Sequence, residues 1–299
     1  MHSRRGFTVI EVMLFLGISG FLIIGLMVGT SATIARQRYN DSVEDLAEFF
    51  RREYSAATNI QNSRTDAVDN RSCNNDSVSN NDEDGGVFRG RSGCLIYGRL
   101  IVIGERADSL NPDERSVIYS YDVLGRELNE REKSFAPDLI TALKSASINV
   151  LVQSTPGNLS SCTHQPVGQS RYSPQWLATI ENTASGRSPL RASILIVRSP
   201  VNGTVHTLVL NGTALQVQAA VDSPCTSGIA RNLLDPVIGE FESTDIDLCV
   251  GSEDIFAFAG RRRNVRILKS GHNSSAVEII GQDNIYDAET NPRGNRCQE

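Results

Sequence analysis

The stretch Phe7–Glu11 (FTVIE), followed by the apolar run Val12–Ile34, decides the fold of this 299-residue chain. Arg4, Arg5 and Gly6 precede it, and Glu11 is the only charged residue between Phe7 and Ile34. As one helix, the segment 7–34 would be about 40 Å long, and a bilayer core needs only about 20 apolar residues. A carboxylate at membrane depth costs at least about 2.5 kcal/mol, so we expect Glu11 to have a partner.

Two arginines, Gly6, the Phe7–Glu11 stretch and an apolar helix together resemble the class III signal of type IV pilins and type II secretion pseudopilins. The resemblance implies that residues 1–6 are a leader, removed by a prepilin peptidase that cuts between Gly6 and Phe7. It also implies methylation of the new Phe7 amine. In this family the glutamate at the position of Glu11 is proposed to pair with the N-terminal amine of a neighbouring pilin subunit. The other implied partner is an assembly platform in the inner membrane.

The charges around the apolar segment predict its orientation. Arg4 and Arg5 lie before it, so the N-terminus is expected inside and the head outside the cytoplasmic membrane. A secretory signal peptide is the competing interpretation, but the run is too long and lacks an Ala-x-Ala cleavage site at its end. A plain membrane anchor explains the run but not the position of Glu11. We therefore expect a single-pass inner-membrane protein that later enters an extracellular pilus.

The helix is predicted to continue beyond the membrane, because residues 35–61 carry an apolar stripe. Its members recur at steps of three and four: Tyr39, Val43, Leu46, Phe50, Tyr54, Ala57 and Ile60. One helix from Phe7 to about Ile60 would be about 80 Å long. Residues 62–93, rich in Asn and Asp, are predicted to form a polar loop.

Residues 94–299 are predicted to form a β-rich globular head, either as one domain or as two subdomains. Asn202-Gly203 and Asn211-Gly212 lie between apolar runs and predict tight hairpins. The predicted strands are 94–103, 116–121, 148–153, 176–180, 192–198, 205–210, 214–221, 246–250, 265–268 and 277–280, with one helix at 138–146. A long helix packed on an antiparallel sheet gives the class α+β, which is also the architecture of pilin heads.

Six cysteines in an exported head favour up to three disulfides. Six cysteines allow 15 pairings, and the sequence does not choose among them. Our hypothesis is Cys73–Cys94, Cys162–Cys225 and Cys249–Cys297. The last pair would pin the C-terminal tail, as disulfides do in pilin heads. The alternative is that some of these thiols are free and buried.

No catalytic, metal or cofactor site is expected. The histidines are scattered along the chain, and the motifs of zinc proteases, serine hydrolases and P-loop proteins are missing. A net charge of -6 gives the chain as a whole no attraction to nucleic acid.

One local basic segment suggests a ligand. Leu248-Cys249-Val250, followed by residues 256–268 with Gly260, is similar to the C-terminal part of FimT/GspH-type minor pilins, some of which bind DNA through a Gly-Arg-x-Arg element. The resemblance implies phosphate contacts by Arg261, Arg262, Arg263, Arg266 and Lys269. The alternative is that these side chains are solvated or pair with acids such as Glu253 and Asp254.

The size of the head favours one role within the pilin family. A head of roughly 235 residues is hard to repeat along a whole filament. We therefore expect a structural minor subunit of a type IV pilus or pseudopilus. The alternatives are a DNA receptor for transformation and a tip adhesin that binds a surface ligand.

Overall fold

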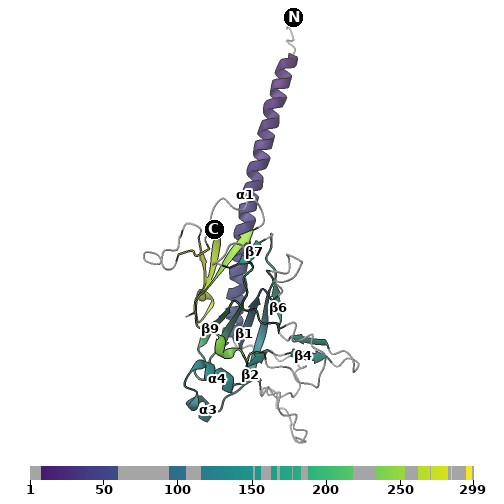
Figure 1. Cartoon of the computed structure of the whole chain (residues 1–299). Coiled ribbons are helices and arrows are strands. Elements are labelled where there is room, and N and C mark those ends of the chain that lie inside the picture. Colours follow the sequence, from purple (N-terminus) through teal and green to yellow (C-terminus); the bar gives the residue numbers. More distant parts are fainter. Residues whose placement is uncertain are drawn as a thin grey trace.

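A computed structural model gives the architecture of the chain (Figure 1). The residues that it describes are 8–59, 94–105, 116–150, 152–155, 163–166, 169–176, 178–182, 188–217, 233–252, 262–269, 271–281, 284 and 294–297. The predicted leader 1–6 and the predicted polar loop 62–93 lie outside these residues.

A single helix, α1 (Val9–Thr58), runs 50 residues from the N-terminal segment into the head. Figure 1 shows it as one rod whose first half projects from the head and whose second half lies along it. The first buried side chain is Ala35, followed by the predicted stripe from Tyr39 to Ala57. The continuous helix predicted from periodicity is therefore confirmed, with its described start two residues later than expected.

The larger sheet has six antiparallel strands. They are β1 (Cys94–Ile103), β2 (Ile118–Arg126), β3 (Asn149–Val150), β6 (Ser170–Tyr172), β8 (Ala192–Arg198) and β9 (Val205–Asn211). The order is β3-β2-β1-β8-β9, with β6 also paired to β2. The predicted hairpin at Asn202-Gly203 connects β8 to β9 through residues 199–204, a loop longer than a two-residue turn, in which Gly203 has a positive φ of 73°.

A second antiparallel sheet packs on the same helix. It contains β7 (Ala178–Glu181), β10 (Ile246–Ser252), β11 (Arg263–Ile267) and β12 (Val277–Ile280), in the order β12-β11-β10-β7. The strands β4 (Val152–Thr155) and β5 (Thr163–Pro166) form a separate two-stranded ribbon. Short helices are α3 (Glu130–Phe135), α4 (Leu139–Ser145), η1 (Ile238–Glu240) and η2 (Ser274–Ala276).

The alternation of side chains along β1 builds two apolar clusters, one on each face of the larger sheet. Ile101 and Ile103 belong to the cluster that also contains the stripe of α1 and strands of the second sheet. Leu100 and Val102 point to the opposite face and pack with α4 and η1. The α+β class, a long helix on a largely antiparallel β head, is thus confirmed.

Several predicted elements are wrong in extent or kind. No strand forms over 214–217, the described part of the predicted strand 214–221, because the open edge of β9 is occupied by Glu242, which exchanges two backbone hydrogen bonds with Val209. Helix α3 was not expected, although its capping box of Asn129 and Glu132 is visible in the sequence. The predicted strand 148–153 is divided between β3 and β4, and Trp176 lies outside β7.

A buried polar network fixes α1 on the larger sheet. Glu53, 2% exposed, accepts hydrogen bonds from Ser120 Oγ at 2.6 Å and Ser170 Oγ at 3.1 Å. Its carboxylate also lies 3.5 Å from Arg99 Nε, and Arg99 pairs in turn with Asp122 at 2.7 Å. Burial raises the pKa of Asp122, while the Arg99 charge opposes this rise. A charged group within an apolar stripe disfavours other registers of the helix on the sheet.

Candidate functional site

The start of α1 is an exposed capping box built by Thr8 and Glu11. The Glu11 carboxylate accepts hydrogen bonds from the Thr8 backbone N–H at 2.9 Å and the Thr8 hydroxyl at 3.0 Å, and the Glu11 N–H donates to Thr8 Oγ1 at 3.3 Å. The Thr-x-x-Glu spacing before an apolar run is a sequence signal for this cap, which our sequence reasoning missed. Glu11 therefore has a partner within its own helix.

The apolar half of α1 has no packing partner within the described residues of the chain. Its large side chains, from Val9 to Val28, are between 46% and 80% exposed. By length and composition α1 could cross a membrane. Gly6 and Phe7, the predicted cleavage site, lie outside the described residues, so processing stays a prediction.

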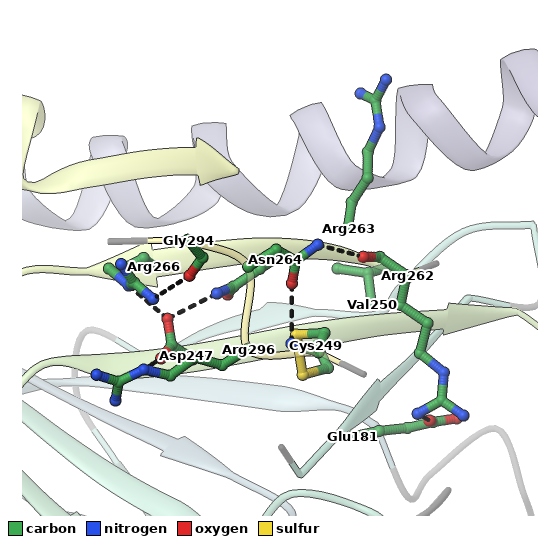
Figure 2. Close-up of a disulfide and its surroundings, with 12 residues drawn as sticks. Glu181, Asp247, Cys249, Val250, Arg262, Arg263, Asn264, Arg266, Gly294 and Arg296 are labelled. Atoms are coloured by element: carbon green, nitrogen blue, oxygen red, sulfur yellow. Dashed lines mark hydrogen bonds and ion pairs between the residues drawn. A yellow bond between two sulfur atoms is a disulfide. The ribbon is translucent and has the colours of Figure 1, made fainter. Parts of the chain in front are cut away.

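A second candidate site surrounds the disulfide between Cys249 on β10 and Cys297, 48 positions later (Figure 2). This pairing was predicted and is confirmed. Cys73, Cys162 and Cys225 lie outside the described residues, as does the side chain of Cys94. The other two pairings therefore stay predictions.

Hydrogen bonds fasten the C-terminal segment 294–297 beside the disulfide. Asn295 Nδ2 donates to the Arg262 carbonyl at 2.6 Å, and the Cys297 N–H donates to Asn295 Oδ1 at 2.8 Å. Arg266 Nη2 donates to the Gly294 carbonyl at 2.9 Å. Segment 294–297 is thus tied to β10 by the disulfide and to β11 by Arg266, one of the predicted DNA-contacting arginines.

Two of the five candidate DNA contacts are buried in ion pairs. Arg262 lies 2.5 Å from a carboxylate oxygen of Glu181, and Arg266 Nε donates to Asp247 Oδ1 at 2.6 Å. The whole residues Arg262 and Arg266 are only 8% and 3% exposed. Asn264 Nδ2 donates to the same Asp247 oxygen at 2.7 Å. Pairing with acids was the predicted alternative, but the acids are Glu181 and Asp247; Glu253 and Asp254 lie outside the described residues.

The remaining candidates do not join Arg262 and Arg266 on one surface. Side chains alternate along β11, so Arg262 and Arg266 point away from α1, whereas Arg263 points to the side of the helix (Figure 2). Lys269 is exposed beyond the end of the strand. Arg261 lies outside the described residues.

Tyr39 links α1 to the sheet that carries the disulfide. Its hydroxyl donates to the Val250 carbonyl at 2.9 Å and accepts from the Arg263 N–H at 2.7 Å. Val250 and Arg263 are directly opposed on β10 and β11. Burial raises the pKa of Tyr39. The sequence identified Tyr39 only as part of the apolar stripe, since its polar partner is 211 positions away.

Two histidines that are distant in the sequence are neighbours in the fold. The rings of His206 and His272 have centroids 6.3 Å apart. Burial lowers the pKa of His206, and the nearby His272 adds to this effect. No cluster of three or more metal-binding side chains occurs in the described parts of the chain.

Comparisons with protein-family models, with curated proteins and with solved structures give no match to this chain.

Proposed function

We propose that this chain is a prepilin-like structural subunit, minor rather than major, of a type IV pilus or a related pseudopilus. The observation that carries the proposal is the exposed apolar half of α1, with Glu11 as its only carboxylate, at its first turn. Such a surface needs lipid or other apolar helices around it. Subunits that leave the bilayer would bury it against one another.

The continuity of α1 supports the same proposal. One helix carries both the exposed apolar surface and the buried stripe that packs on both sheets. The buried Glu53 network and the Tyr39 hydroxyl fix the head on this helix. A rigid connection would let packing of the N-terminal halves determine where each head lies on a filament.

The experiment is a set of three variants expressed in the native host. Glu11→Gln keeps an acceptor for the capping box, in which glutamine also serves, but removes the charge proposed to meet a neighbouring N-terminal amine. Thr8→Val removes the Thr8 hydroxyl from the cap and keeps the charge. Glu44→Gln removes an exposed carboxylate from the other half of α1 and serves as the matched control.

Incorporation is measured in sheared filaments, and the mature N-terminus by intact mass. We expect Glu11→Gln to lose incorporation while Thr8→Val and Glu44→Gln retain it, with all three proteins beginning at Phe7. Full incorporation of Glu11→Gln, or a chain that still begins at Met1, would contradict the proposal.

The DNA-receptor alternative receives no support from the described contacts. Arg262 and Arg266 would have to break buried ion pairs to reach a phosphate. Of the described candidates, only Arg263 and Lys269 then remain as possible DNA contacts. Adhesion likewise has no described site that favours it. Salt-dependent DNA binding that is lost in Lys269→Ala would revive the first alternative.

A further inference from the structure

One loop of the head lies directly beside α1 where the apolar half ends. The segment Gln175–Trp176, between β6 and β7, is held on the helix by two contacts. Ser42 Oγ donates to the Gln175 carbonyl at 3.0 Å. The Arg38 guanidinium lies 4.6 Å from the centre of the Trp176 ring, a cation–π contact. The indole is therefore fixed at the level of Arg38 on the helix.

Packing inside the head does not explain this tryptophan. Trp176 is 50% exposed, and its backbone adopts a left-handed conformation with φ of 57°, which is unfavourable for a residue other than glycine. Outside α1, the large apolar side chains exposed among the described residues are Phe135, Trp176 and Val201. A strained backbone that presents a large ring outward suggests a contact beyond the head.

The charges along α1 give the depth of this site. No charged residue occurs between Glu11 and Arg36, and the exposed Arg36 and Arg38 follow immediately. Arg38 is four positions beyond Ile34, which is about 6 Å along a helix. The headgroup layer on each side of a bilayer is about 5–7 Å thick. With Ile34 at the edge of the hydrocarbon, Arg38 and Trp176 would lie among the headgroups.

The chemistry of the pair fits that layer. Tryptophan is enriched at membrane interfaces because its large ring is apolar and its N–H is polar. Arginine reaches phosphates from such positions along its apolar stem. Arg36 and Arg38 are both exposed on the helix.

We propose that Trp176, held by Arg38, inserts into the headgroup layer of the bilayer that α1 crosses, and so seats this corner of the head on the membrane. The partner is a phospholipid surface. The proposal rests on α1 crossing the bilayer and is independent of filament assembly. It adds a second, shallow membrane contact to the anchor and sets the tilt of the head above the lipid.

Trp176 is the only tryptophan of the chain, so its emission reports this site alone. The full chain is reconstituted in phosphatidylcholine–phosphatidylglycerol vesicles whose lipids carry bromine either near the headgroup end of the acyl chain or at mid-chain. We expect the shallow bromine to reduce the emission by roughly half and the mid-chain bromine to reduce it less, as for a residue of the aromatic belt. Emission that neither lipid quenches would overturn the proposal.

Two relocated tryptophans serve as controls in a Trp176→Phe background. Phe135→Trp places the ring on α3, at the other end of the head, where Phe135 is 73% exposed, and should escape both quenchers (Figure 1). Phe21→Trp, where Phe21 is 80% exposed in the apolar half of α1, should be quenched most by the mid-chain bromine. If Phe21→Trp is quenched and Trp176 is not, the helix spans and the seating is refuted. If neither tryptophan is quenched, both the contact of Trp176 with the headgroups and the crossing of the bilayer by α1 are refuted.

The role of Arg38 is tested with Arg36 as its matched control. Arg38→Gln removes the cation from the ring, whereas Arg36→Gln removes the same charge two positions earlier. We expect the first variant to lose most of the shallow quenching and the second to retain it. Equal quenching in both variants would show that Arg38 does not hold the indole.

Discussion

The buried pair Asp247–Arg266 offers a quantitative test of how the C-terminal part of the head is held together. The two residues are directly opposed on β10 and β11, and their side chains are 5% and 4% exposed. Asp247→Asn keeps the shape of the side chain and leaves the Arg266 cation buried without its carboxylate. Removing one partner of a buried pair costs about 3–5 kcal/mol, so we expect a loss of that size.

A double-mutant cycle separates the pair from its surroundings. Arg266→Met removes the cation but keeps an apolar stem, and Asp247→Asn/Arg266→Met leaves neither charge of the pair. We expect the double variant to be more stable than the sum of the single losses predicts, with a coupling of about 2–3 kcal/mol.

The assay is guanidinium unfolding of the full chain in detergent, followed by far-ultraviolet circular dichroism. The control is Glu130→Gln, which breaks the Lys133–Glu130 pair on the surface and should leave the midpoint unchanged. Strictly additive single variants, or an Asp247→Asn loss below about 1 kcal/mol, would refute the reasoning.

Three further outcomes are expected from the same unfolding assay. Replacing Cys249 and Cys297 by alanine opens a loop with a sequence separation of 48 and should lower the free energy of unfolding by about 4 kcal/mol through loop entropy; a midpoint equal to that of the oxidised wild-type chain would contradict this. Tyr39→Phe leaves the Val250 carbonyl and the Arg263 N–H without their shared partner and should cost about 1–3 kcal/mol, whereas a neutral effect would show that water replaces it. Burial raises the pKa of Tyr54 to about 12. The contribution of the neutral Tyr54 side chain to the free energy of unfolding is therefore complete below pH 10 and is lost as pH rises toward 12, by up to roughly 2–3 kcal/mol. Tyr54→Phe should flatten this alkaline decline in stability, and an identical decline would exclude Tyr54 as its source.

Periodic and local signals account for most of the fold that could be predicted. The 3.6-residue stripe gave α1, and the turn Asn202-Gly203 gave the β8–β9 hairpin. Helix α3 was missed although its capping box is a local signal, whereas the predicted strand from 214 failed because a distant segment decides the local structure. Glu242 closes the edge of β9, which a strand from 214 would have needed.

The candidate sites divide in the same way. Glu11 and the apolar run are contiguous, so their spacing was sufficient to single them out. The arginines of residues 261–269 looked like one basic patch because the sequence does not show which side chains share a face. The register of β10 against β11 places Arg266 opposite Asp247 and turns Arg263 toward α1.

The sequence alone determined a membrane-length helix with one carboxylate at its start, an amphipathic continuation and a β-rich head. Each of these depends on residues within a few turns or strands of one another, so propensity and periodicity carry the information. Only the tertiary structure decided that Arg262 and Arg266 are buried in ion pairs, that Tyr39 bridges two strands, and that Trp176 lies against Arg38. These contacts join residues far apart in the chain. Strand register and packing on α1 select them from many side-chain pairings that the local sequence does not distinguish.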